Sequence, residues 1–280
     1  MDLCVKVQRE LFSGLGAKYI VLLRAYLDES GLHADPGVVV VAGAITTANS
    51  WDSFSAKCVP FLKKQGVKFF GTSDFFASKN EFDGWDEPRK MAFLKKFMPI
   101  VNTPKKVVVG HGVKLAEFET VRAEFPKVRI TKYQYCLEKC LAAIMHWAWS
   151  KPKVEPIAVI IEAGNKTGSQ TFRLFNAATD YPWLQQKYKL ASISVQPKQL
   201  PTGEYIYPFQ VADIVANSIY KHHKAILDAP GDTFTIENTL LPLLKPKERF
   251  GYMDTPDKIR EWFQVAQNSK EYLEQVGEKI

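Results

Sequence analysis

Short apolar runs and longer segments of helical periodicity follow one another along most of the chain. Five of these runs are rich in β-branched and aromatic residues and are bounded by turn formers, which predicts β-strands. They cover residues 19–28, 38–46, 105–114, 156–165 and 190–197. The second run, VVVVAGAIT, has no apolar–polar alternation, so we expect a strand buried on both faces. The turn-rich SGLHADPG before it predicts an antiparallel hairpin with the first run.

Six segments predict helices from their apolar periodicity or their end signals. They are residues 49–66, 87–102, 131–150, 168–186, 207–226 and a last helix that begins at Pro256. Asn49 or Ser50 is the expected cap of the first helix and Thr131 that of the third, because short polar side chains satisfy free N–H groups. The expected buried stripe of the second helix consists of Met91, Leu94, Phe97 and Met98.

The order of these elements predicts an α/β fold, with a mixed sheet covered by helices on both faces. Two or three strands come first, and helices and strands then alternate, which favours this packing. We expect one domain over residues 1–227 and a helical extension over residues 228–280 that packs on the same domain.

Acidic residues occupy positions where a carboxylate is costly. Asp28 and Glu29 stand together where the first strand ends. Adjacent strand residues face opposite sides of a sheet, so one of these two acids faces inward. Glu162 follows the apolar run IAVII of the fourth strand, and Asp213 lies in the middle of the apolar helix 207–226. A helix that is apolar all round is buried, and a buried Asp needs a cation or hydrogen-bond donors.

Parallel packing of the first and fourth strands would bring Asp28 and Glu162 to one edge of the sheet, where helix 207–226 can add Asp213. Two unit charges about 4 Å apart repel by roughly 4 kcal/mol at an effective dielectric of about 20. Convergence therefore predicts a bound cation, and hard oxygen ligands favour Mg²⁺ or Mn²⁺. Such ions activate water and stabilise phosphodiester displacement. The predicted activity is metal-dependent hydrolysis of nucleic acid, with Asp28, Glu162 and Asp213 as metal ligands and Glu29 assisting.

The motifs AYLDESG and FQVADIVA, in this order, resemble the family called domain of unknown function 3800. The family pattern is an Asp-Glu-Ser-Gly turn after the first strand and a Gln-x-Ala-Asp helix late in the chain. The matching positions are residues 28–31 and Gln210, Ala212 and Asp213. The resemblance spans roughly residues 20–225 and implies a ribonuclease H-like fold, with a mixed five-stranded central sheet and a carboxylate metal site.

Two positions depart from the pattern that the resemblance implies. The segment FFGTSDFF is similar to an intermediate stretch of the family, which has a histidine near the position of Gly71. That histidine is missing here, whereas Asp74 is retained. The acid that closes the middle strand is often Asp in the family and is Glu162 in this chain. These departures put a role for the histidine in doubt and leave catalysis open.

Several other polar residues have both a structural and a functional interpretation. Asp74 and Glu138 are minor candidates for the acidic site, although Glu138 lies on a helix where exposure to solvent is expected. Lys198, before the apolar helix, is expected to be solvated, with a phosphate contact as the alternative.

Cysteine and histidine residues are expected to be structural. Cys136 and Cys140 repeat on one helical face, which is typical of core packing. His222 and His223 are expected near a helix C-terminus, where they complement the dipole. His111, between two glycines, is expected in the core or in an edge strand.

Charge adds a candidate surface. The chain has a formal net charge of +7, and residues 89–132 hold eleven Lys or Arg against three acids. Such a block attracts a nucleic-acid backbone, or it is a solvated face that keeps the protein soluble. The four cysteines have no disulfide spacing, and the N-terminal residues are not a signal peptide. No apolar run is long enough to cross a bilayer, so we expect a cytoplasmic protein without a membrane partner.

Three functions remain open at the level of the sequence. The first is the metal-dependent nuclease, and the second is a non-catalytic nucleic-acid-binding or scaffolding protein of the same fold. The third is an enzyme that acts on a nucleotide or another small phosphorylated molecule. A nucleophile elbow, a phosphate-binding glycine loop and a dinucleotide fingerprint are absent from the sequence, which argues against the corresponding enzyme classes.

Overall fold

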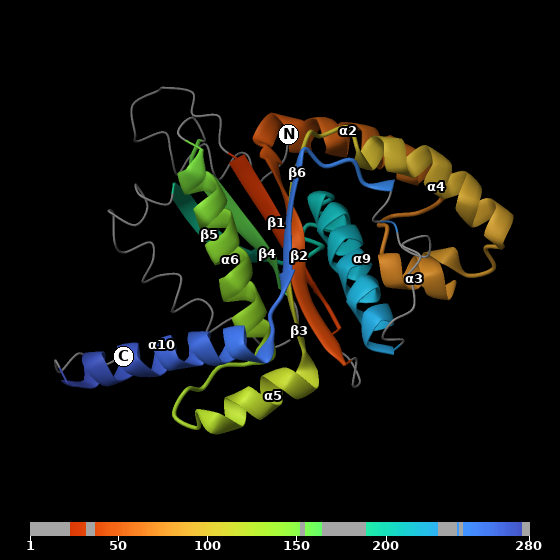
Figure 1. The fold of residues 1–280 in the computed structure, drawn as a ribbon. Coiled ribbons are helices and arrows are strands. Elements are labelled where there is room, and N and C mark those ends of the chain that lie inside the picture. Colours follow the sequence, from red (N-terminus) through yellow and green to blue (C-terminus); the bar gives the residue numbers. More distant parts are fainter. Residues whose placement is uncertain are drawn as a thin grey trace, which may run out of the picture.

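A six-stranded mixed sheet forms the centre of the protein, in the order β5-β4-β1-β2-β3-β6 (Figure 1). This computed structural model describes residues 23–31, 37–151, 155–163, 189–228, 240 and 243–275. The strands are β1 Leu23–Ser30, β2 Val38–Thr47, β3 Val107–Lys114, β4 Ile157–Glu162, β5 Leu190–Gln196 and β6 Glu248–Met253. The α/β class predicted from the sequence is therefore confirmed.

The pairing of the strands places the ends of β1 and β4 next to each other. β1 and β2 form the predicted antiparallel hairpin, and β2 pairs with β3 in the same manner. β4 runs parallel to β1, with Leu27 opposite Ile161, so that the next residues along these strands are Asp28 and Glu162. β5 extends the sheet parallel to β4. The parallel packing of the first and fourth strands, on which the expected meeting of Asp28 and Glu162 depends, is present.

The sixth strand corrects the expected number of five. β6 lies in the segment 228–280, for which only helices were expected, and it pairs parallel to β3 at the edge of the sheet. Its sequence ERFGYM is short, begins with two charged residues and contains a glycine, so it has no clear apolar run. Pairing with the buried strand β3 therefore defines β6, and intrinsic strand propensity contributes little.

Helices cover both faces of the sheet, as predicted. The helices are α2 Ala48–Gln65, α3 Thr72–Ala77, η1 Asn80–Phe82, α4 Glu87–Val101, α5 Leu115–Glu124, α6 Lys132–Ser150, α9 Pro208–Asp228 and α10 Pro256–Gln275. One buried cluster joins α2, α3, α4 and α9 to one face, and a second joins α5, α6 and α10 to the other (Figure 1). Among the described residues, no helix combines the length and apolarity needed to cross a membrane. The helix expected at 168–186 lies outside the described residues.

Strand β2 is the centre of both buried clusters. Its side chains alternate between the α9 face, with Val38, Val40, Ala42 and Ala44, and the α6 face, with Val39, Val41 and Ile45. All of these side chains are buried. The absence of apolar–polar alternation in VVVVAGAIT thus results from helices on both sides of the sheet.

Of the helix caps predicted from the sequence, one is confirmed and one is wrong. Helix α2 is capped by Thr47, whose hydroxyl accepts the Ser50 N–H at 3.2 Å, so the caps expected at Asn49 or Ser50 are wrong by two or three residues. Thr131 caps α6 as predicted, and Gln134 completes a capping box. The cap of α2 lies earlier than expected because β2 ends at Thr47 and the helix begins at the next residue, Ala48.

Two expectations for helix surfaces are wrong. Met91 is 57% exposed, and Phe93 takes its place on the buried side of α4, among the rings of Phe70, Phe75 and Phe97. The residues His222–His223 do not lie in the last turn of α9, because the helix continues to Asp228. The expected packing of Cys136 and Cys140 in the core is confirmed.

A polar network around Asp254 ties the end of β6 to the second face of the sheet. The Asp254 carboxylate lies 3.0 Å from His111 Nε2 and 3.4 Å from Lys139 Nζ, and it accepts the Tyr135 hydroxyl. These partners come from β3 and α6. Although burial opposes its ionisation, bonds with His111 and Tyr135 and the positive charge of Lys139 lower the pKa of Asp254 to about 2. His111, which the sequence left as a core or edge residue, is buried and joins this network.

Replacing Asp254 is expected to destabilise the protein mainly above pH 4. The folded carboxyl has a pKa of about 2 against an ordinary value of 3.8, so ionised Asp254 stabilises the fold above 3.8 and loses this effect as the pH falls towards 2. Asp254→Asn should lower the free energy of unfolding by about 1–3 kcal/mol at pH 7. Urea unfolding at pH 7 and pH 2.5 measures the difference. An equal loss at both pH values would show that the charge is not the cause.

Candidate metal centre

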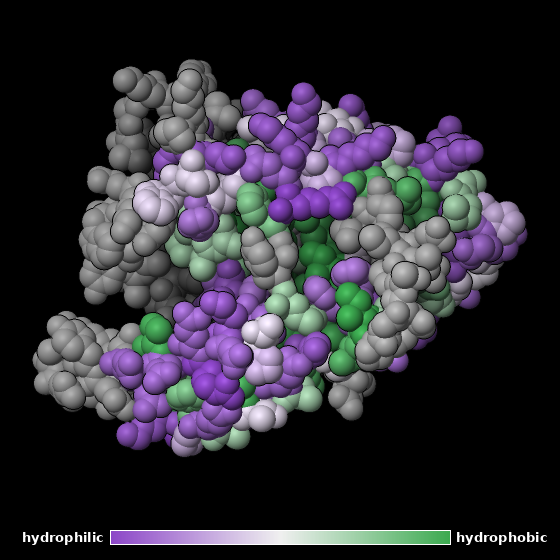
Figure 2. All heavy atoms as spheres, in the orientation of Figure 1, coloured by the Kyte–Doolittle hydropathy of each residue, from purple (hydrophilic) through white to green (hydrophobic). Residues whose placement is uncertain are grey.

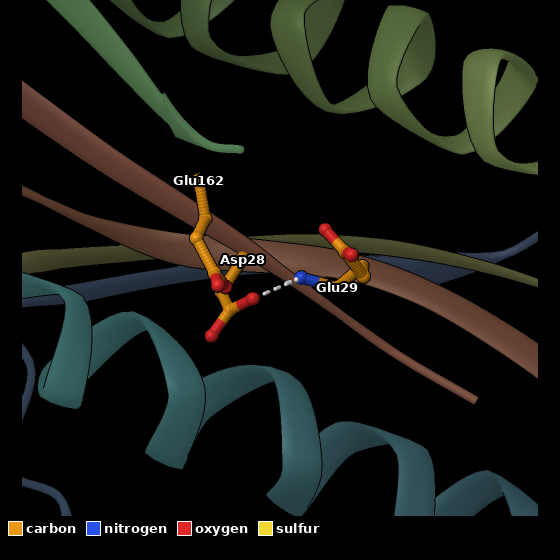
Figure 3. A group of neighbouring side chains, drawn as sticks. All are labelled: Asp28, Glu29 and Glu162. Atoms are coloured by element: carbon orange, nitrogen blue, oxygen red, sulfur yellow. Dashed lines mark hydrogen bonds between the residues drawn. The ribbon is translucent and has the colours of Figure 1, made fainter. Parts of the chain in front are cut away.

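The alternation of side chains along the strands decides where the acids point. Asp28 lies on the same face of β1 as Tyr26, which belongs to the α9 cluster, whereas Leu27 belongs to the α6 cluster. Glu29 therefore faces the α6 side. Figure 3 shows the Asp28 and Glu162 carboxylates side by side above α9, with the Glu29 carboxylate directed away from that helix. The expectation that one acid of the pair faces inward is confirmed by Asp28, which is only 3% exposed.

Three carboxylates meet at this end of the sheet. Asp28, Glu29 and Glu162 each offer one oxygen, and these oxygens lie within 4.8 Å of one another. The Asp28 Oδ1 atom accepts the Glu29 N–H at 2.7 Å (Figure 3). The meeting of Asp28 and Glu162 follows from the parallel pairing of β1 and β4, because both residues come after the last paired positions.

Lys198 neutralises part of this cluster, which corrects the expected solvated lysine. Its Nζ atom lies 3.2 Å from Asp28 Oδ2 and 3.0 Å from Glu162 Oε2. Burial opposes the charge of Lys198, but attraction to Asp28, Asp213 and Glu162 outweighs it and raises the pKa of the ammonium. This contact has little signal in the sequence, because Lys198 lies in a loop far from both acids along the chain.

The carboxyl groups bind protons more tightly than usual. Burial raises the pKa of Asp28 well above its ordinary value, a hydrogen bond with Glu162 adds to this, and the charge of Lys198 opposes it. Burial and the nearby Glu162 raise the pKa of Glu29 to about 7. Full ionisation of these acids would place more negative charge in the cluster than Lys198 alone compensates, so the carboxyl groups take up protons more readily than usual.

The donor set fits a hard divalent cation. Asp28 Oδ2 and Glu29 Oε2 are buried oxygens without a hydrogen-bond donor among the described residues, although Lys198 lies near the first as an ion-pair partner. A carboxylate oxygen that lacks a donor is costly to bury. All the donor atoms are carboxylate oxygens, which are the ligands that Mg²⁺ and Mn²⁺ prefer.

Asp213 does not belong to the group of three carboxylates with oxygens in mutual reach. Its Oδ2 atom accepts the Thr72 N–H at 2.6 Å, and Gln210, one turn earlier on α9, accepts the Phe70 N–H at 2.9 Å. Gln210 and Asp213 are three residues apart and face the same way, so they hold the chain at two points, Phe70 before α3 and Thr72 at its first residue. We call this pair of contacts the α9 clamp. Asp213 remains close enough to Lys198 and Glu162 to interact electrostatically with both.

Steric constraints explain why a glycine occupies the last position of the DESG turn. Gly31 has φ +84°, in the left-handed region that favours glycine. A Cβ atom at this position would lie 2.2 Å from the Val38 carbonyl oxygen and 2.9 Å from the ring of Tyr220. Any side chain at Gly31 would therefore push β1 away from β2 and α9 and displace the neighbouring acids.

The minor acidic candidates lie elsewhere. Asp74 is in α3, near Gly71, and it is not part of the carboxylate group. Glu138 is half-buried on α6, not exposed as expected, and burial raises its pKa to about 7. Tyr133 at the start of α6 is a residue that the sequence did not single out. Burial and then the charges of Glu29, Asp28 and Glu162 raise its pKa, so its phenol is a neutral neighbour of the cluster.

The basic block 89–132 does not form one surface. Its first part lies on α4, on the α9 side of the sheet, and its later part lies around α5, on the opposite side (Figure 1). Figure 2 shows hydrophilic residues over α5 at the lower edge and near α4 at the right, with hydrophobic residues between them. Lys106 is fully buried and donates to the Val101 carbonyl at 2.8 Å, and Lys114 is paired with Glu117. The basic residues of the block are therefore divided between the two sides of the sheet.

Comparison of the chain with models of known protein families and with curated protein sequences gives no match.

Proposed function

We propose that the protein is a divalent-metal-dependent phosphodiesterase that hydrolyses nucleic acid at the carboxylate cluster. The observation that carries the proposal is the convergence of Asp28, Glu29 and Glu162 within 4.8 Å. Among the described residues, the buried Glu29 Oε2 atom has no donor, and Lys198 is the ion-pair partner of Asp28 Oδ2. Bound Mg²⁺ or Mn²⁺ would supply an activated water and charge stabilisation for phosphodiester displacement. The chain would hold the ion through these carboxylates and orient the substrate through Lys198.

The proposal divides the roles of the acids in a way that differs from the sequence expectation. Asp28 and Glu162 are the first two ligands, since they lie together on the α9 face of the sheet. Glu29 is a better third ligand than Asp213, because its oxygen is within reach of both. Asp213 positions the segment at Thr72 and adds negative charge nearby.

The fold is consistent with the resemblance to domain of unknown function 3800. The mixed sheet with helices on both faces supports a ribonuclease H-like assignment, with β6 as an addition at one edge. The DESG turn supplies Asp28, and the Gln-x-Ala-Asp helix supplies the α9 clamp. This assignment and the nucleic-acid substrate belong to the proposal.

The proposal is tested by Mn²⁺ binding and by cleavage of labelled DNA and RNA. We expect Mn²⁺ to bind with a Kd in the micromolar to millimolar range, and cleavage to require Mn²⁺ or Mg²⁺. Glu162→Gln should weaken Mn²⁺ binding by roughly tenfold or more, because a charged ligand becomes neutral. Glu155→Gln is the matched control, since Glu155 is exposed just before the same strand.

The third ligand is decided by the same titration. Glu29→Gln should weaken Mn²⁺ binding more than Asp213→Asn does. The reverse order would return Asp213 to the ligand set and assign Glu29 a supporting role. Mn²⁺ binding that is equal in the unmodified protein and in Glu162→Gln would remove the metal centre from the proposal.

One observation favours a second candidate function, a non-catalytic nucleic-acid-binding or scaffolding protein. Lys198 already places a positive charge between Asp28 and Glu162, so the cluster has partial neutralisation without an ion. In that case nucleic acid would bind in a salt-sensitive way, and no substrate would be cleaved in the presence of Mn²⁺.

A further inference from the structure

A cavity of about 300 Å³ adjoins the carboxylate cluster and shares Lys198 with it. Its lining is formed by Phe69, Gly71, Asp74, Asn80, Glu81, Phe82, Lys198 and Tyr205. Two aromatic rings form one part of the wall, because Phe69 and Tyr205 stack with their centroids 5.3 Å apart. Tyr207 stacks on the Phe69 ring at 6.5 Å and extends this aromatic group.

Hydrogen bonds fix the walls of the cavity. The α9 clamp holds residues 70–72, and Glu81 Oε2 accepts the N–H groups of Lys68 and Phe69 at 2.8 and 3.2 Å. On the other side, the Ile206 N–H donates to the Lys198 carbonyl at 2.9 Å and closes a short loop. That loop carries both Lys198 and Tyr205. The aromatic wall and the backbone of Lys198 are therefore held in a constant relation.

The chemistry of the lining selects the kind of ligand. Stacked, half-buried aromatic rings bind flat π systems, and every nucleobase has such a face. Asp74 and Glu81 supply acceptors, and Asn80 supplies both a donor and acceptors. Two carboxylates repel a phosphate inside the cavity, whereas Lys198 at its border attracts one. The lining thus fits a base inside the cavity and its phosphate towards the cluster.

We propose that this cavity binds one unpaired nucleobase next to the phosphate that is held at the carboxylate cluster. The inference rests on the proposed function and makes the substrate a single-stranded nucleic acid or an unstacked nucleotide in one. A base inside a duplex is stacked on its neighbours and would have to leave the stack to reach Phe69 and Tyr205. Carboxylate acceptors favour a base with an exocyclic amino group.

Binding of oligonucleotides without metal tests the inference. Fluorescence anisotropy compares a labelled single-stranded octadeoxycytidylate with a fully abasic strand of equal length and charge, both in EDTA. The unmodified protein should bind the strand with bases roughly tenfold more tightly. Tyr205→Ala should remove most of this preference, and Tyr205→Phe should retain it. Trp149→Ala is the matched control, because Trp149 is an exposed aromatic residue on α6.

The outcomes separate this inference from the proposed function. Equal binding of both strands, or binding of neither, overturns the base site, and it leaves metal-dependent cleavage to be judged by the Mn²⁺ experiment. Loss of the preference in Trp149→Ala as well as in Tyr205→Ala also overturns it. Phe69→Leu is a second test in case Tyr205→Ala fails to fold, since it alters the other ring of the stacked pair. It should reduce the preference for the strand with bases while the Tm stays unchanged.

Discussion

Asp28→Asn is expected to abolish Mn²⁺ binding and to lower cleavage by about 1000-fold or more, which corresponds to roughly 4 kcal/mol of transition-state stabilisation. The amide keeps the shape of the side chain but removes the charge that a hard cation needs. Asp28 has the greatest effect of the acids because it is only 3% exposed and lies between Glu162, Glu29 and Lys198. Mn²⁺ titration and cleavage of labelled single strands measure the two effects.

Stability distinguishes a metal ligand from a structural acid. Burial raises the pKa of Asp28, so its ionised form costs the metal-free protein free energy. Asp28→Asn should therefore leave the Tm in EDTA unchanged or higher, and it should remove the rise in Tm caused by Mn²⁺. Asp83→Asn, at an exposed position between η1 and α4, is the control and should alter neither measurement. A marked fall of the Tm in EDTA would show that Asp28 is mainly a structural partner of Lys198.

Much of the sheet could be predicted because buried strands have a strong local signal. The apolar run of β2 and the turn before it define the hairpin, and the acids at the ends of β1 and β4 follow from parallel pairing. β6 could not be predicted, since its ERFGYM sequence has no apolar run and its strand conformation depends on β3. Met91 was misplaced because the buried side of α4 continues from Leu94 to Phe93 and Lys90, which lie among the aromatic cluster, and leaves Met91 at its exposed border.

The acidic site was predictable only for residues whose direction a strand determines. Alternation on β1 and β4 places Asp28 and Glu162 on one face. A helix residue such as Asp213 has no such constraint, and its actual bond to the Thr72 N–H joins segments 141 residues apart. Lys198 was missed for the same reason, because a lysine in a loop has no periodicity that reports its partners. Long-range polar contacts of this kind leave little trace in a single sequence.

Under the proposed function, the ammonium of Lys198 and a divalent cation would compete for the same carboxylates. Lys198 lies 3.2 Å from Asp28 and 3.0 Å from Glu162, so it supplies positive charge where an ion would bind. An ion held by Asp28 and Glu162 would weaken the attraction of the ammonium to these carboxylates. Lys198 also lines the cavity, so its ammonium would then be available to pair with a substrate phosphate.

Lys198→Met is accordingly expected to tighten Mn²⁺ binding roughly tenfold and to slow cleavage. Methionine retains the length of the side chain without its charge, so the carboxylates lose their counter-ion in the metal-free protein. The free energy of unfolding in EDTA should fall by about 2–3 kcal/mol, less than for a fully buried pair because Lys198 is one-third exposed and the acids can take up protons. Saturating Mn²⁺ should restore the lost stability, and thermal unfolding with and without Mn²⁺ measures this recovery.

A control substitution is compared with Lys198→Met in the same measurements of Mn²⁺ affinity and unfolding. Lys57→Met removes an exposed lysine from α2 and should leave Mn²⁺ affinity and stability unchanged. Weaker Mn²⁺ binding in Lys198→Met would contradict competition between the ammonium and the ion. Loss of stability without recovery in Mn²⁺, in a protein that cleaves no substrate, would identify the cluster as an ion-paired structural element. Since this one substitution removes the counter-charge without touching any carboxylate, it separates a metal centre from a buried salt bridge.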